Sequence, residues 1–184
     1  MAAHFPILQI VGYQNSGKTS FVEMLADKLE HSGVKVGCLK HHGHGGEPEA
    51  LTEGKDSDRF WRAGAAVSGV EGAGVLQLSA RGDWTLEKLI ALYSLMPIDC
   101  LLIEGFKQAA FPKVVMVKNE ADGHLLEQLS GTIAVIYRDS QPREVPNGVP
   151  SFHIADPGAM SYILNHLKEE GVCLNDSSSP KNRL

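Results

Sequence analysis

The chain has 184 residues, enough for one domain of ordinary size whose core requires neither disulfides nor a metal. Its 43% hydrophobic and 21% charged residues are close to globular averages, which excludes wholesale disorder. The formal net charge of −5 argues against a dedicated nucleic-acid-binding protein.

The sequence shows no targeting, membrane or disulfide signal. Apolar runs are too short to span a bilayer, and no basic segment followed by an apolar one marks a signal peptide. Cys38, Cys100 and Cys173 are too few and too scattered for a disulfide framework, and each is expected to be a reduced core residue. We therefore expect a cytoplasmic protein whose partners include neither a membrane nor a nucleic acid.

Apolar runs alternate with helical periodicities along the chain. The first half predicts, in order, a strand at 7–11, a helix at 17–32, a strand at 34–39, a loop at 41–46 and a short helix at 56–63. Next come two β-like runs, 67–70 and 75–78, which predict a hairpin. The second half predicts a helix at 86–93, strands at 100–103 and 114–117, a short helix at 125–129, strands at 133–137 and 152–155, and a helix from Pro157 to 170, capped by Asp156.

One segment fits the phosphate-binding P-loop pattern G-x-x-x-x-G-K-[ST]: Gly12-Tyr13-Gln14-Asn15-Ser16-Gly17-Lys18-Thr19. An apolar strand precedes the motif and an amphipathic helix follows it, so the positive end of the helix dipole would face a bound anion. We expect Lys18 to reach the β- and γ-phosphates and the Thr19 hydroxyl to bind Mg²⁺. The expected phosphate-binding set is Gly12, Gln14, Asn15, Ser16, Gly17, Lys18, Thr19 and Ser20.

Strand–helix alternation with continuously apolar strands is typical of an α/β fold whose parallel sheet is covered on both faces. With the P-loop, it predicts a P-loop NTPase-like three-layer sandwich with a mostly parallel sheet and an additional β-hairpin. Residues 1–172 are expected to form a single P-loop nucleotide-binding domain, and residues 173–184 a disordered tail.

Besides the threonine of the P-loop, a P-loop enzyme needs an acidic side chain at the end of another strand to hold Mg²⁺ or its water ligand. Asp99 and Glu104 flank the strand predicted at 100–103, but ligands bind beyond the carboxyl ends of strands in such sheets, which favours Glu104. We assign Lys18 and Glu104 to catalysis, and Thr19 and Glu104 to Mg²⁺.

The loop after the second strand is rich in histidine. Lys40, His41, His42 and His44 should emerge near the phosphates, where they could contact phosphate, substrate or Mg²⁺-bound water, bind a transition metal, or serve only as a polar loop. Asp56 either caps a helix or belongs to a phosphate-sensing switch. Arg138 and Asp139 follow the strand at 133–137 and could face the base or ribose of a nucleotide.

The P-loop occurs in order with four further segments: Lys40-His41-His42-Gly43-His44-Gly45, Gly54-Lys55-Asp56-Ser57, Arg62-Ala63-Gly64-Ala65 and Leu102-Ile103-Glu104-Gly105-Phe106-Lys107. This combination resembles the molybdopterin-guanine dinucleotide biosynthesis protein B (MobB) family over about residues 5–170. The resemblance implies a homodimer that binds GTP and Mg²⁺ and hydrolyses GTP slowly. It also implies an accessory role beside MobA, the guanylyltransferase that attaches GMP to molybdopterin during maturation of the molybdenum cofactor.

The choice of nucleotide rests on this resemblance, because the sequence lacks N-K-x-D, the common guanine-reading motif of GTPases. Two other classes remain open. One is a metallochaperone GTPase that delivers a metal through the loop His41 to His44, and the other is a P-loop kinase that phosphorylates a small molecule.

Overall fold

The computed structural model describes residues 4–43 and 56–175. The chain divides into two compact units, one formed by residues 1–43 and 90–184 and the other by residues 44–89. A single domain over residues 1–172 stays a prediction, and residues 176–184 of the expected tail lie outside the described part.

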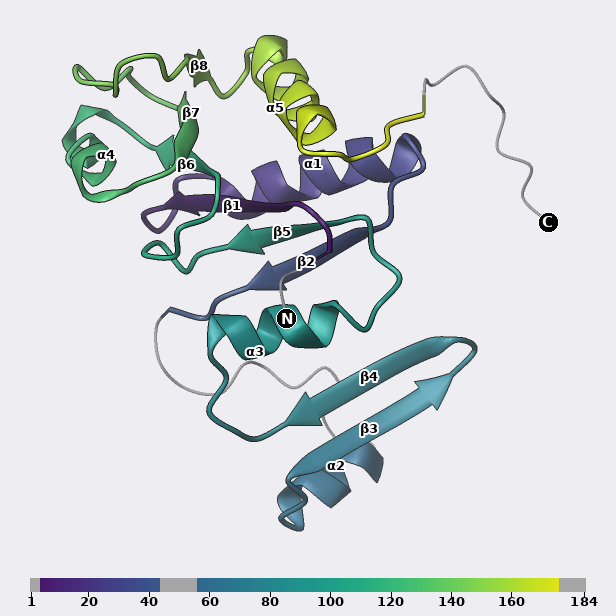
Figure 1. Cartoon of the computed structure of the whole chain (residues 1–184). Coiled ribbons are helices and arrows are strands. Elements are labelled where there is room, and N and C mark those ends of the chain that lie inside the picture. Colours follow the sequence, from purple (N-terminus) through teal and green to yellow (C-terminus); the bar gives the residue numbers. More distant parts are fainter. Residues whose placement is uncertain (1–3, 44–55, 176–184) are drawn as a thin grey trace. The chain divides into compact units, whose positions relative to one another are not determined.

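The larger unit is built on a parallel sheet of six strands in the order β2-β5-β1-β6-β7-β8 (Figure 1). Every neighbouring pair in this sheet is parallel, as the sequence predicts for strands that are apolar on both faces. The strands are β1 (Ile7–Gly12), β2 (Val36–Lys40), β5 (Cys100–Glu104), β6 (Lys113–Val117), β7 (Thr132–Tyr137) and β8 (Ser151–His153).

Helices cover both faces of the sheet, so every residue of β1, β5 and β6 is buried. Helices α1 (Lys18–His31) and α5 (Pro157–Glu169) lie on the same side of the sheet in Figure 1, and both contribute to one core cluster that includes Ile10. Val11 belongs to a second cluster, with Leu125 and Leu126 of α4 (Leu125–Gln128). Successive residues of β1 thus pack into opposite layers, which confirms the three-layer α/β architecture.

The predicted cap of the last helix is confirmed. Asp156 caps α5 by accepting a hydrogen bond from the Gly158 N–H at 2.8 Å.

Of the three cysteines only Cys100 is buried, and burial raises the pKa of its thiol to about 12. Cys38 and Cys173 are exposed, so the expectation of core positions is wrong for these two. Cys38 lies on β2, an edge strand, and hydrophobic neighbours in sequence do not bury a residue there.

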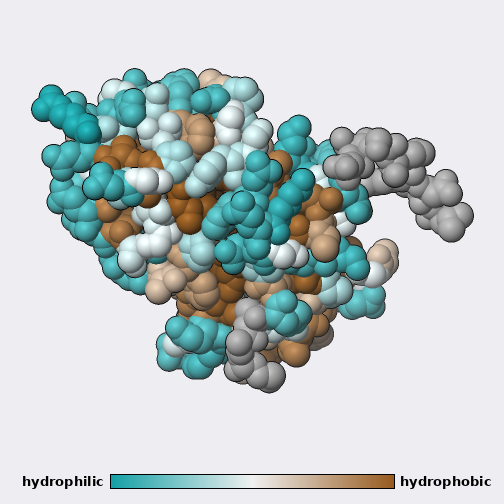
Figure 2. Space-filling model, turned by 45° about the horizontal axis from the view of Figure 1, so that its top comes forward, coloured by the Kyte–Doolittle hydropathy of each residue, from teal (hydrophilic) through white to brown (hydrophobic). Residues whose placement is uncertain are grey.

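Two further elements are short. The 3₁₀ helix η1 (Glu120–Asp122) precedes α4 in the larger unit, and α3 (Leu86–Tyr93) contains the boundary between the two units, which falls between Leu89 and Ile90. Hydrophilic and hydrophobic residues are interspersed over the face of the molecule shown in Figure 2. Among the residues described, no helix combines the length and apolar composition needed to cross a bilayer.

The smaller unit contains α2 (Asp56–Arg62) and an antiparallel hairpin of β3 (Val67–Gly72) and β4 (Val75–Ala80). The turn residues Ala73 and Gly74 have φ angles of 51° and 78°, the left-handed conformation that two-residue hairpin turns require. The predicted additional hairpin is therefore confirmed.

Candidate functional site

The loop between β1 and α1 has a backbone that only glycine can form at two positions. A Cβ on Gly12 would overlap the carbonyl oxygen of Met116 and lie 2.7 Å from Ser16 Oγ. Gly17 has φ 93° and directly precedes α1, so a side chain there would be strained. Of the predicted phosphate contacts, Gln14 and Asn15 are exposed, whereas the Ser16 side chain is buried. These constraints give the P-loop pattern a physical reason at this place in the fold.

Lys18 and Ser20 lie in the first turn of α1. The Lys18 ammonium donates a hydrogen bond of 2.6 Å to the Tyr13 carbonyl, which folds this side chain back over the loop. Its pKa lies below the ordinary value, mainly because burial disfavours the charged form. Glu104 raises this pKa, whereas the nearby charges of Lys107 and Lys40 lower it further. The positive charges of Lys18, Lys40 and Lys107 outnumber the single carboxylate of Glu104 in this group, which makes this end of the sheet attractive to an anion.

Thr19 and Glu104 meet at the same edge. The Thr19 hydroxyl donates a hydrogen bond of 2.9 Å to Glu104 Oε2. Strand register brings them together, because Glu104 is the last residue of β5 and pairs with Ile10 of β1, two residues before the P-loop begins. A threonine hydroxyl and a carboxylate are oxygen ligands of the kind that Mg²⁺ prefers, so the pair fits a magnesium ion that also takes phosphate oxygens and water.

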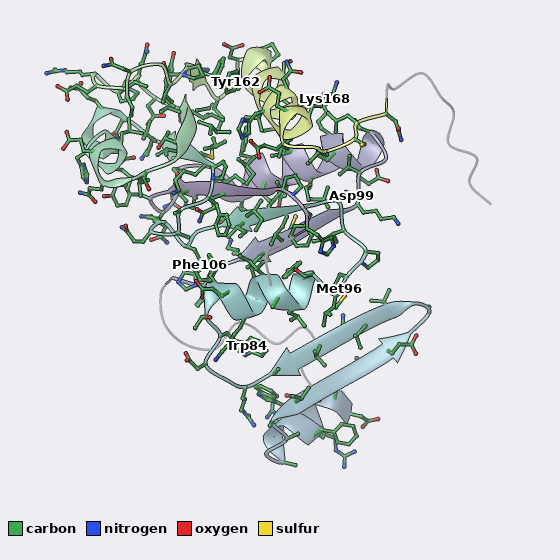
Figure 3. All side chains as sticks on the ribbon, viewed as in Figure 1. Trp84, Met96, Asp99, Phe106, Tyr162 and Lys168 are labelled. Carbon is green, nitrogen blue, oxygen red and sulfur yellow. The ribbon has the colours of Figure 1, made fainter. Side chains whose placement is uncertain are left out.

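Asp99 lies at the opposite end of β5. Its carboxylate accepts a hydrogen bond of 2.7 Å from the Lys35 N–H. Figure 3 shows Asp99 and Phe106 at the two ends of this strand. Of the two acidic candidates named from the sequence, Glu104 is therefore the one placed beside Thr19.

The turn after Glu104 is held by a residue that the sequence analysis missed. Gln9 of β1 is fully buried, and its Nε2 donates to the carbonyls of Gly105 at 3.0 Å and Phe106 at 2.9 Å. Gly105 and Phe106 both have positive φ, 102° and 50°. A polar residue inside an otherwise apolar strand was the only available signal for Gln9, because its partners are 96 and 97 positions away.

The histidine loop begins beside this turn. The His41 N–H donates to the Glu104 carbonyl at 2.9 Å, and its ring lies 4.3 Å from the ring of Phe106, centroid to centroid. His42 is exposed, and His44 lies outside the described residues. Within the described ranges 4–43 and 56–175, no three His, Cys, Asp or Glu side chains form a group suited to a metal ion, so the metallochaperone alternative gains no support there.

Asp56 and the pair Arg138 and Asp139, which were also named from the sequence, lie in different parts of the structure. Asp56 lies in the first turn of α2 in the smaller unit, where its carboxylate is 3.4 Å from Arg59 Nη1. Arg138 follows β7, and its guanidinium donates a long hydrogen bond of 3.4 Å to the Asn15 carbonyl of the P-loop. Arg138 Nε also lies 3.4 Å from Asp139 Oδ1. The structure thus brings the end of β7 next to the P-loop.

Tyr13 links the P-loop to two further residues that the sequence analysis did not name. The Lys107 ammonium lies 4.2 Å from the centre of the Tyr13 ring, within the range of a cation–π contact. The Tyr13 hydroxyl lies 2.7 Å from His124 Nε2. Both partners are distant in sequence, so no local pattern could have identified them.

Comparison with known proteins identifies the family of this chain. Residues 7–138 match the family model of "Molybdopterin guanine dinucleotide synthesis protein B", MobB, which covers more than half of the chain. The chain belongs to the MobB family. The resemblance to MobB that the P-loop and four further short segments of the sequence carry is therefore confirmed.

Members of the MobB family align with most of the chain. A curated relative from Bacillus subtilis (strain 168), the "Probable molybdopterin-guanine dinucleotide biosynthesis adapter protein", is 54% identical over 168 residues, which are 91% of this chain and 96% of the relative. A crystal structure of Bacillus subtilis MobB has 53% identity and a TM-score of 0.78, covering 90% of this chain and 100% of that one. A MobB homologue from Bacillus stearothermophilus has 34% identity and a TM-score of 0.71, covering 89% and 98%. These neighbours confirm the P-loop NTPase-like fold class.

Proposed function

We propose that the protein binds GTP together with Mg²⁺ and acts as an adapter in molybdopterin-guanine dinucleotide biosynthesis. One observation carries the proposal: Lys18, Thr19 and Glu104 converge where β1 and β5 end, next to the glycine-dependent loop of residues 12–17. Membership of the MobB family and a relative described as a probable adapter protein in this biosynthesis support the adapter role.

Each of these residues would have a separate task. The main chain of the P-loop would surround the phosphates, and the Lys18 ammonium would leave the Tyr13 carbonyl to bind phosphate oxygens. The Thr19 hydroxyl and the Glu104 carboxylate would hold Mg²⁺, directly or through water. When bound, Mg²⁺ neutralises charge that develops on the β- and γ-phosphate oxygens.

Hydrolysis would be slow. No arginine among the described residues is assigned a contact with the γ-phosphate, and P-loop sites that lack such an arginine turn over far more slowly than assisted sites. The slow reaction fits an adapter whose nucleotide state organises a partner, here a MobA-like guanylyltransferase or another protein of molybdopterin cofactor synthesis. We further propose that it works in the cytoplasm as a homodimer.

Selection of guanine is the least obvious part of the proposal, because the sequence lacks the common guanine-reading motif. Arg138 and Asp139 support it by position. They follow β7, and the Arg138 guanidinium reaches the P-loop carbonyl of Asn15. A base bound beyond the phosphates on this side would meet a carboxylate, which can accept both hydrogen bonds that guanine donates from its ring edge.

The test is calorimetric titration of the chelator-treated, full-length protein with a slowly hydrolysed GTP analogue and with its ATP counterpart, each with Mg²⁺. We expect tight binding of the GTP analogue, a clear preference over ATP, and loss of binding in Lys18→Ala. Lys35→Ala is the matched control, because Lys35 lies beside Asp99 at the other end of β5.

Each contrary result has a defined meaning. Absence of binding to both nucleotides, or unchanged affinity in Lys18→Ala, would contradict the nucleotide proposal. Preference for ATP would contradict the assignment of GTP and favour the small-molecule kinase. Binding of a MobA-like guanylyltransferase that is the same with GTP analogue, with GDP and without nucleotide would contradict an adapter controlled by nucleotide.

A further inference from the structure

Lys40 is the last residue of β2, and its ammonium lies next to the Thr19 hydroxyl and the Glu104 carboxylate, the two groups to which we assign Mg²⁺. Its Nζ donates a hydrogen bond of 3.1 Å to Thr19 Oγ1 and lies 3.4 Å from Glu104 Oε1. We propose that Lys40 is a built-in counter-cation of the Thr19–Glu104 pair, which the divalent ion must displace in order to bind. This inference rests on the proposed Mg²⁺–nucleotide function and adds a regulatory residue to the same site.

The fold itself places Lys40 there. In the parallel pairing of β2 with β5, Lys40 is the direct partner of Glu104, and both are the last residues of their strands. Paired residues of neighbouring strands project from the same face of a sheet, so the two charged groups lie side by side. The Thr19 hydroxyl completes the group from the first turn of α1.

The two partners differ in their freedom to move. The Lys40 side chain is 59% exposed, whereas that of Glu104 is 11% exposed. Glu104 is further fixed by its strand, and its carbonyl accepts the His41 N–H at 2.9 Å. Lys40 can therefore swing away on its flexible stem, while the carboxylate stays in place.

An ammonium and a magnesium ion cannot share these oxygens. Mg²⁺ binds oxygen ligands at about 2.0–2.1 Å in a demanding octahedral geometry, and a second cation next to the same ligands would repel it. The Thr19 hydroxyl must also turn its proton away from Glu104 Oε2 before its oxygen can face the metal. Mg²⁺ binding at this pair is thus an exchange of one cation for another.

Such an exchange favours the metal–nucleotide complex over the free metal. A nucleotide that arrives with Mg²⁺ brings phosphate oxygens, which are further ligands and negative charges for the metal. Free Mg²⁺ brings no such anion, so it has to displace Lys40 with the attraction of the Thr19–Glu104 pair alone. Lys40 would therefore discourage occupation of the site by a divalent ion alone.

The experiment measures the Mg²⁺ concentration that gives half-maximal binding of a fluorescent, slowly hydrolysed GTP analogue to the full-length protein. Lys40→Met removes the charge and keeps the apolar stem, so the half-maximal Mg²⁺ concentration should fall about two- to fivefold, as expected for a partly exposed ion pair. Lys40→Arg keeps the charge and should show no such fall. Glu104→Gln should change the value in the opposite direction, because a ligand of Mg²⁺ is weakened.

Lys35→Met is the control for general loss of positive charge. Lys35 is exposed and directly precedes β2, whereas Lys40 ends this strand. The Lys35 N–H donates to Asp99 Oδ2 at 2.7 Å, at the opposite end of β5 from Glu104. The Mg²⁺ requirement should stay as in the wild type. An unchanged or increased requirement in Lys40→Met, or an equal decrease in Lys35→Met, would overturn the proposal.

If the wild-type protein does not bind the analogue at any Mg²⁺ concentration, the proposed function fails. Titration with Mn²⁺ alone, followed by electron paramagnetic resonance, then decides the role of Lys40 separately. Tighter Mn²⁺ binding by Lys40→Met than by the wild type would support displacement of Lys40, and equal binding would refute it.

Discussion

Replacement of Gln9 by leucine tests the buried contact that holds the turn after Glu104. Leucine fits a buried strand and has no polar atoms, so Gln9→Leu removes both hydrogen bonds that Nε2 donates to the carbonyls of Gly105 and Phe106. It also removes Gln9 Oε1, a buried oxygen with no hydrogen-bond partner among the residues that the structure describes.

The size of the effect follows from what each carbonyl retains. Phe106 O still accepts the Ala109 N–H at 2.9 Å, so its loss is that of an ordinary hydrogen bond, about 0.5–1.5 kcal/mol. Gly105 O loses the partner that Gln9 provides, at about 1–3 kcal/mol, and removal of the unpaired Oε1 offsets part of both losses. We expect the free energy of unfolding to fall by about 2 kcal/mol, or roughly 4–8 °C in Tm.

The assay is urea denaturation followed by circular dichroism, with Gln141→Leu as the matched control. The Gln141 amide makes an exposed hydrogen bond of 2.8 Å to Ser151 Oγ, so its loss should change stability by less than about 0.5 kcal/mol. A Gln9→Leu protein as stable as the wild type, or more stable, would refute the reasoning, because the buried amide would then cost as much as it contributes.

Three further predictions concern other positions. Gly105→Ala should destabilise the protein more than Gly148→Ala in the same denaturation assay: both positions have positive φ, 102° and 80°, but only a Cβ on Gly105 meets another atom, His41 Cβ at 2.9 Å. Equal losses would show that this contact relaxes without cost. Burial lowers the pKa of Lys113, so the unfolded chain binds the proton more tightly, and stability should rise as pH increases through the folded-state pKa towards 10.5. Unfolding curves measured over this range should show a smaller rise in Lys113→Met, and an identical rise would exclude Lys113 as its source. Asp156→Ala should cost about 1 kcal/mol by removing the cap of α5, whereas Asp156→Asn, which can still accept the Gly158 N–H, should lose less.

The order of helices and strands was predictable from the sequence, because each element carries its own local signal. The apolar run before Gly12, the helical periodicity after Gly17 and the capping residue Asp156 depend only on near neighbours in the chain. The P-loop was predictable for the same reason, since its glycines, Lys18 and Thr19 are contiguous. Glu104 required one further step, the rule that ligands bind beyond the carboxyl ends of parallel strands.

Tertiary structure decided the contacts between those elements. Strand order places Lys40 next to Glu104 and Gln9 beneath the turn at Gly105, over sequence separations that no local pattern spans. The same order makes β2 an edge strand and leaves Cys38 exposed, although its apolar neighbours in sequence favoured a core position. The sequence by itself determined which segments form the site. Which side chains meet there depended on pairing between distant strands, because a residue's neighbours across a sheet are set by register and not by distance along the chain.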